Sequence, residues 1–156
     1  MRRAQFGSFA AVVGMTAVLS ASAVEYPAGK VPVISQRTFV AGNAKLRVAG
    51  SFAIDANVPI NKPASIGDGE MTWLQYGDSG SAAPNVGVTI STYEVGVSVG
   101  LGKKVATIGA EKCKGKMTVT GNLITGQYKC PGVTSYEPPS LKLGKVDIEI
   151  EFSAQS

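Results

Sequence analysis

Residues 113–130 read CKGKMTVTGNLITGQYKC, and they decide the fold because they specify a hairpin together with its register. Gly121-Asn122 is a two-residue turn signal between two β-prone segments. With that turn, facing residues have numbers that sum to 243, which places the only two cysteines, Cys113 and Cys130, opposite each other. Counting outward from the turn makes them a non-hydrogen-bonded pair, whose Cα atoms lie about 4.5 Å apart. A disulfide spans that separation, so we predict one between Cys113 and Cys130.

The same register sorts the hairpin into two faces, as a half-buried antiparallel pair requires. The apolar face contains Cys113, Gly115, Met117, Val119, Ile124, Gly126, Tyr128 and Cys130. The other face is mostly polar and carries three lysines, Lys114, Lys116 and Lys129. A shift by one residue would mix the two faces and separate the cysteines.

The first 23 residues have the pattern of a signal peptide. Arg2 and Arg3 precede an apolar stretch over residues 6–19, and Ala21-Ser22-Ala23 supplies a small-residue cleavage site. The apolar stretch is shorter than the roughly 20 residues that a membrane-spanning helix needs, so we expect no stable membrane insertion after cleavage. Export agrees with a disulfide, which persists in oxidising compartments. We therefore predict a secreted or periplasmic protein.

Residues 24–156 have the composition and turn spacing of one all-β domain. We expect an antiparallel β-sandwich of about eight short strands, with an extended lead-in at 24–44; the alternative is a small β-barrel. Residues 46–54 alternate in polarity like a single strand. Residues 85–101 form the longest β-rich run, and its change of phase at Ser91-Thr92 predicts a β-bulge or a strand that crosses between sheets. No segment has a sustained helical period.

The residue types exclude several classes of chemistry. The chain has no histidine, which removes the usual general base and the commonest zinc ligand. Both cysteines are committed to the predicted disulfide. The net charge of +4 includes Arg2 and Arg3, and the lysines are scattered, so nucleic-acid binding is not expected. We predict no enzymatic activity, no catalytic residue, no cofactor and no metal site.

Asp147, Glu149 and Glu151 form the densest acidic group. Alternate residues of a strand share a face, so these carboxylates follow one another at roughly 7 Å. A calcium site or a paired-acid catalyst is one interpretation. We favour a solvated strand face whose charges are compensated by Lys114, Lys116 and Lys129 if the last strand, 145–152, neighbours the hairpin.

Trp73 and Tyr76 are the most suggestive ligand-binding candidates. They lie beside a loop rich in glycine and serine, and an exposed indole there could stack on a sugar ring or anchor a partner. A core position is the commoner placement for the only tryptophan of a small β protein.

These observations favour a non-enzymatic, exported structural or adhesive component of the cell surface or periplasm. It would bind a protein partner or self-associate through strand edges, either at the lead-in or at the acidic last strand. The alternative is a secreted glycan-binding or small-ligand-binding module that uses Trp73 and Tyr76. A carboxylate-based hydrolase ranks last, because no pair of acids is forced together.

Overall fold

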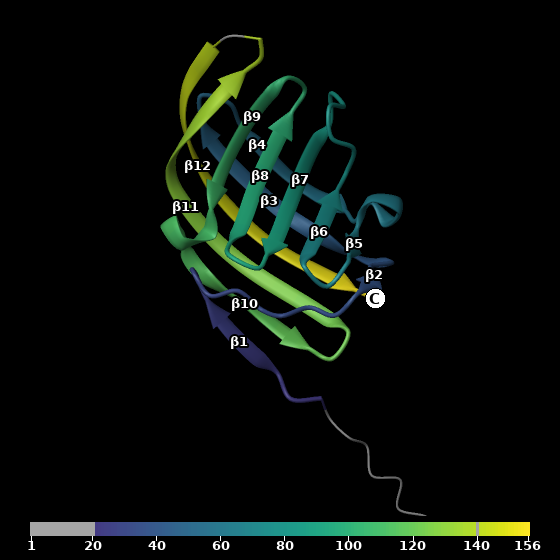
Figure 1. Cartoon of the computed structure of the whole chain (residues 1–156). Coiled ribbons are helices and arrows are strands. Elements are labelled where there is room, and N and C mark those ends of the chain that lie inside the picture. The colour runs from purple at the N-terminus through teal and green to yellow at the C-terminus, as the bar shows by residue number, and fades with distance from the viewer. Residues whose placement is uncertain (1–20, 140) are drawn as a thin grey trace, which may run out of the picture.

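The computed structural model describes residues 21–139 and 141–156, so the predicted signal peptide lies almost entirely outside the described residues. The all-β class is confirmed (Figure 1). The strands are β1 (Val24–Pro27), β2 (Arg37–Thr38), β3 (Ala41–Gly50), β4 (Ile54–Pro59), β5 (Ile66–Gly67), β6 (Met71–Tyr76), β7 (Pro84–Ser91), β8 (Val95–Leu101), β9 (Lys104–Gly109), β10 (Lys114–Thr120), β11 (Leu123–Glu137) and β12 (Leu141–Gln155). Two short 3-10 turns, η1 (Lys62–Ala64) and η2 (Ala110–Lys112), complete the described secondary structure.

The hairpin β10–β11 has the predicted register. Thr120 faces Leu123 and Lys114 faces Lys129, so facing residues sum to 243 throughout. The turn uses Gly121 at φ 58°, a left-handed conformation that glycine adopts without steric cost. Cys113 and Cys130 form the disulfide, with their Cα atoms 4.4 Å apart. Most of the side chains predicted to face the core are buried, among them Met117, Ile124 and Tyr128, and Val119 is partly buried.

β11 is the strand that joins the two parts of the sheet. Its first half pairs with β10, whereas Ser135 and Tyr136 near its end pair with β9. Between these regions the pairing with β12 shifts after Cys130, and Gly132 there has a φ of 65°. The disulfide lies at this change of partner, and it ties the bulged part of β11 to the residue that follows η2. The predicted disulfide therefore also restrains the junction between the two parts of the sheet.

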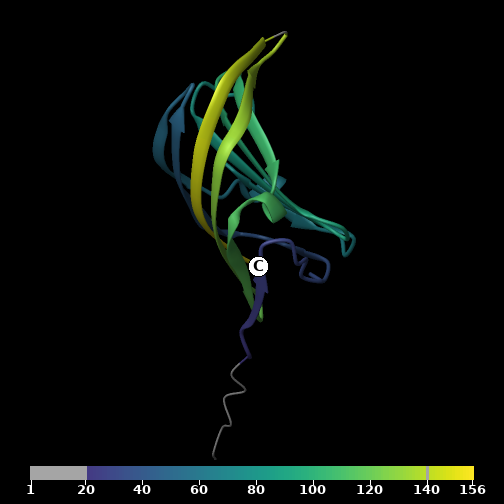
Figure 2. The ribbon, with the colours of Figure 1, turned by 90° about the vertical axis from the view of Figure 1, so that its left-hand side faces the viewer.

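All strands on the main path belong to one antiparallel sheet, in the order β2-β5-β6-β7-β8-β9-β11-β12-β3-β4, and β1 extends β10. The sheet curls so that β6–β9 lie in front of β3, β4 and β12 (Figures 1 and 2). The two ends meet across the core, where the Tyr76 hydroxyl donates to the Ser153 carbonyl at 3.0 Å. The Tyr76 and Phe152 ring centroids are 6.3 Å apart, and Ile60 bridges to Tyr76.

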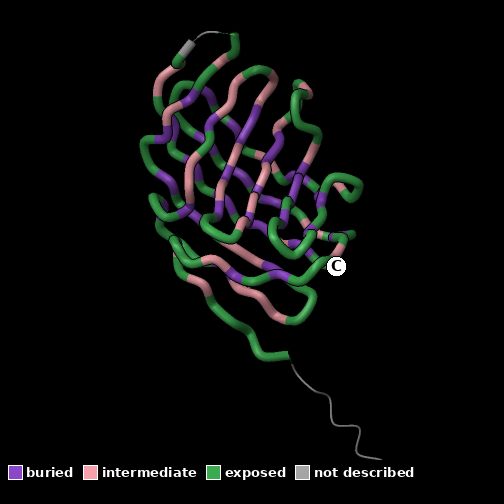
Figure 3. Tube along the Cα trace, in the orientation of Figure 1, coloured by how far each residue is buried: buried purple, intermediate pink, exposed green. Residues whose placement is uncertain are grey.

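The alternation of polar and apolar residues places the core inside this curl. Buried positions recur at every second residue along β7 and β8 (Figure 3). The valines of these strands face inward, together with the apolar residues of β3 and β12. Because alternate residues point to opposite sides of a sheet, the curl leaves the other side chains on two outer faces.

The prediction of a single strand over residues 46–54 is wrong. The segment contains the end of β3, a turn at Ser51, Phe52 and Ala53, and the start of β4. β3 and β4 pair as a hairpin in which Val48 faces Ile54. Alternation continues through the turn because Phe52 is buried like the strand residues beside it, so the polarity pattern hides the reversal of the chain.

The prediction of a bulge or a sheet crossing at Ser91-Thr92 is also wrong. β7 and β8 form a hairpin in which Ile90 faces Val95. The turn has no glycine or proline; instead the Ser91 Oγ accepts the backbone N–H groups of Tyr93 and Glu94 at 3.3 and 3.2 Å. Serine can support a turn in this way, but it is a weak sequence signal. These two splits, together with short strands such as β2 and β5, raise the number of described strands to twelve.

The two predicted strand edges have different outcomes. Among the strands of the described residues, β1, in the lead-in, pairs with β10 alone, and none of them covers its other side. β12, the acidic last strand, is paired with β11 on one side and β3 on the other. The acidic strand therefore lies inside the sheet and offers no free edge.

Candidate binding surfaces

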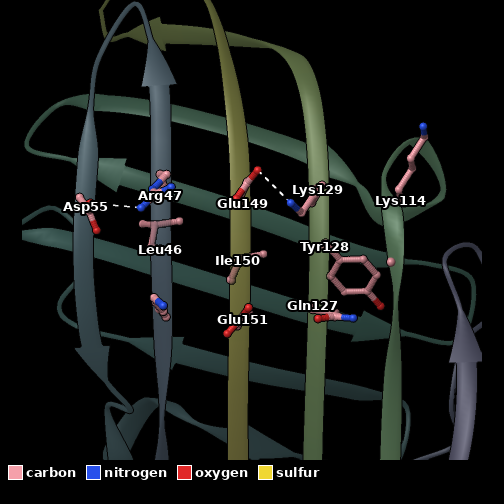
Figure 4. Close-up of a pocket in the computed structure, with 12 residues that line it drawn as sticks. Leu46, Arg47, Asp55, Lys114, Gln127, Tyr128, Lys129, Glu149, Ile150 and Glu151 are labelled. Carbon is pink, nitrogen blue, oxygen red and sulfur yellow. Dashed lines mark hydrogen bonds and ion pairs between the residues drawn. The ribbon is translucent and has the colours of Figure 1, made fainter.

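The outer face of β4, β3, β12, β11 and β10 is charged, and it contains an open depression of about 350 Å³ (Figure 4). One rung of successive Cα partners runs across all five strands: Asp55, Arg47, Glu149, Lys129 and Lys114. Along this rung two ion pairs form, Arg47–Asp55 at 3.8 Å and Lys129–Glu149 at 3.2 Å. The charges from Asp55 to Lys129 thus alternate in sign and compensate each other across the strands, whereas Lys114 faces the like charge of Lys129.

The three acids of β12 have structural partners. Glu149 pairs with Lys129, as the sequence-based interpretation of this face predicts. Asp147 accepts a hydrogen bond from the Gly132 backbone N–H at 2.7 Å, which gives this N–H group in the bulge of β11 a partner. Glu151 faces Lys45 in the register. Lys116 forms its ion pair with Glu25 of β1 rather than with β12. Within the described residues there is no group of three or more potential metal ligands. This face is a solvated ladder of charges.

The outer face of β5–β9 has the opposite character, and we call it the neutral face. Its outward side chains are Ile66, Met71, Trp73, Gln75, Asn85, Gly87, Thr89, Ser91, Gly96, Ser98, Gly100, Val105, Thr107 and Gly109. None of these positions carries a charge, although the Glu111 carboxylate of η2 lies over Gly109. Three large apolar side chains gather at its β5–β6 end, where Ile66 is the Cα partner of Trp73 and Met71 is two residues away. Their exposed fractions are 52%, 49% and 44% respectively.

The Trp73 indole is held against the sheet. Its Nε1 donates to Gln75 Oε1 at 3.4 Å. A Cβ placed on Gly87 of β7 would lie 3.8 Å from the indole nitrogen and 3.6 Å from Gln75 Oε1, so the ring extends across this glycine. Gln75 is itself buried, and its amide donates to the carbonyls of Tyr76 and Gly77, both at 3.2 Å. The hydrogen bond to Gln75 restricts the rotation of the indole in the free protein.

The turn between β5 and β6 places these residues. Asp68 accepts the backbone N–H groups of Met71 at 2.7 Å and Glu70 at 3.0 Å. The same two hydrogen bonds, chiefly that from Met71, lower the pKa of the Asp68 carboxyl. The Asp68-Gly69 turn thus fixes where β6 begins and where Met71 and Trp73 stand on the outer face.

Tyr76 does not share a surface with Trp73. The two residues are three apart on β6, so their side chains point to opposite sides of the sheet. Tyr76 is fully buried, and burial raises the pKa of its hydroxyl well above the ordinary value. The structure therefore separates the two predicted ligand-binding residues: Trp73 lies on an accessible face, and Tyr76 is part of the core.

A hollow of about 440 Å³ lies at the other end of the neutral face. β9 and β11 pair only through Ala106–Ser135 and Val105–Tyr136, and they separate beyond these residues. The hollow in the gap is lined largely by small and uncharged residues, and Glu94 and Lys112 also line it. Tyr136, half exposed, stands beside it. Sequence patterns did not single out Tyr136 or the glycine positions, because their relation to Trp73 depends on the order of the strands.

Comparison with protein-family models, with curated proteins and with solved structures gave no significant match. In the described part of the chain, no helix has the length and apolar character needed to span a membrane. Function therefore has to be argued from the surfaces alone.

Proposed function

We propose that this chain is an exported, non-enzymatic adhesive or structural component of the cell surface or periplasm, and that the neutral face is its contact surface. The carrying observation is the group of three exposed apolar side chains, Ile66, Met71 and Trp73, which stand together at uncharged outward positions of one sheet face. Soluble proteins rarely expose large apolar side chains together unless the patch has a binding role.

Export is supported by the signal-like residues 1–23 and by the disulfide, which suits an oxidising compartment. The expected cleavage point after Ala23 lies directly before β1, so removal of the leader would leave the strands intact. The absence of histidine from the whole chain supports a role without general base catalysis by that residue.

The test measures how the mature protein, residues 24–156, is retained on intact envelopes of the cells that produce it. Trp73→Ala should reduce retention roughly tenfold or more, as expected for an interface anchor. Arg47→Ala, on the charged face, is the matched control and should leave retention unchanged. If Trp73→Ala is retained as well as the wild type, or if the wild type is not retained at all, the proposed function is wrong.

A further inference from the structure

The neutral face has a preformed stacking surface, which we call the platform: the Trp73 indole lying over Gly87, with Gln75 holding its nitrogen. The indole nitrogen lies near Gly87 and Gln75, and about half of Trp73 is exposed. An aromatic ring that is oriented in advance loses little conformational entropy when a ligand stacks on it. The platform is therefore a built feature rather than an incidental exposed side chain.

Beyond the platform the surface is low and rich in hydroxyl groups. Thr89 and Gly96 continue the rung that starts at Ile66 and Trp73. In the next rung, Ser98 accepts a hydrogen bond from the Thr107 hydroxyl at 3.1 Å. Gly96 leaves this part of the sheet without a projecting side chain, the Glu111 carboxylate lies over Gly109, and the hollow beside Tyr136 follows. Hydroxyl donors and acceptors thus accompany the aromatic ring along one surface.

We propose that the neutral face binds a neutral polysaccharide, with one sugar ring stacked on the platform and the chain running across the strands towards the hollow beside Tyr136. This inference rests on the proposed function and names its partner. The apolar C–H face of a pyranose matches an indole face, and its hydroxyl groups match serine, threonine and amide side chains. From β6 to β11 the surface spans roughly 19 Å, since neighbouring strands lie about 4.8 Å apart. That length suits several sugar units rather than one.

The charge pattern favours this ligand over other classes. An anionic polymer would need an excess of basic side chains. The outward positions of β5–β9 contain none, and Lys112 at the hollow is accompanied by Glu94 and Glu111. A second copy of this chain would need a broad apolar contact, whereas the exposed large apolar side chains of this face stand at the β5–β6 end. The other outward positions are mostly glycine, serine and threonine, with Gln75, Asn85 and Val105. A neutral, hydroxylated polysaccharide matches both the apolar β5–β6 end and the mostly polar remainder of the face.

The experiment measures depletion of the mature protein by microcrystalline cellulose, chitin, curdlan and starch, and affinity electrophoresis in soluble mannan, at low and high salt. Alginate serves as the anionic comparison. We expect binding to at least one neutral polymer, unaffected by 0.5 M salt and roughly tenfold weaker in Trp73→Ala. Trp73→Phe should retain part of the affinity, because a ring remains. Tyr93→Ala removes an aromatic side chain that is 92% exposed at the β7–β8 turn, and this matched control should bind like the wild type.

The inference is overturned by any of four results: no binding to any neutral polymer, binding that is equal in Trp73→Ala, binding to alginate only, or Trp73-dependent dimerisation in sedimentation. Circular dichroism of each variant separates loss of affinity from loss of fold. If envelope retention depends on Trp73 but none of the neutral polymers binds, the polysaccharide inference fails while the proposed function stands. If envelope retention does not depend on Trp73, the proposed function itself is wrong.

Discussion

Removal of the disulfide should cost about 3 kcal/mol of unfolding free energy. Cys113 and Cys130 are 17 residues apart, and on the chain-entropy account a closed loop of this length restricts the unfolded chain by about that amount. The bond also lies where β11 changes its partner from β10 to β9, so its loss releases the junction of the sheet as well as the hairpin. In Cys113→Ala/Cys130→Ala we therefore expect a melting temperature lower by roughly 10 °C.

The assay is urea unfolding of the wild type, the double variant and the wild type under reductant. The dependence of unfolding free energy on urea should become steeper without the bond, because the unfolded chain exposes more surface. The double variant and the reduced wild type should agree, which controls for the loss of sulfur packing. A loss below about 1 kcal/mol in both samples would refute the argument that the bond restrains the unfolded chain.

Three further predictions follow from side-chain packing and ionisation. Gly126→Ala places a methyl group against the ring of buried Phe152 and should lower the unfolding free energy, measured in urea, by about 1–3 kcal/mol. Gly96→Ala is the control: the nearest atom to its methyl group is 3.9 Å away, so the unfolding free energy should change by less than about 0.5 kcal/mol. Burial raises the pKa of Tyr128 to about 12, whereas the tyrosine of the unfolded state releases its proton near pH 10. The unfolding free energy of the wild type should therefore fall by about 1 kcal/mol between pH 9 and 11, and that of Tyr128→Phe should not show this fall. Equal pH profiles of the two proteins would contradict this. Ser91→Ala removes the hydrogen-bond acceptor of the β7–β8 turn. It should lower the melting temperature by an amount equivalent to about 1 kcal/mol, and an unchanged melting temperature would contradict this role of Ser91.

Local patterns predicted the parts of the fold in which the signal is contained in a short segment. The Gly121-Asn122 turn and the positions of the two cysteines determined the β10–β11 register, and polarity alternation assigned its faces. The same method failed at Ser91, where a side-chain hydroxyl replaces the usual turn residues, and at Phe52, where a buried aromatic residue continues the alternation through a turn. In both cases a count of polar and apolar residues does not detect the reversal of the chain.

The candidate site required more than local patterns. Trp73 was identified from its residue type, but its exposure was not, because that depends on which side of β6 faces the core. Tyr76 was grouped with it by proximity in the sequence, and the period of two places it on the opposite side. The acids of β12 found their partners only once β12 was placed between β11 and β3.

The sequence by itself determined the all-β class, the hairpin at 113–130 with its disulfide, and the absence of histidine chemistry, because each follows from residue identity or from pairing across one short turn. Only the tertiary structure decided which surfaces exist. The neutral face brings together residues of β5, β6, β7, β8 and β9, and the charged ladder brings together residues from positions 47 to 149. Such groupings depend on strand order, which long-range packing of the core sets and local alternation leaves open.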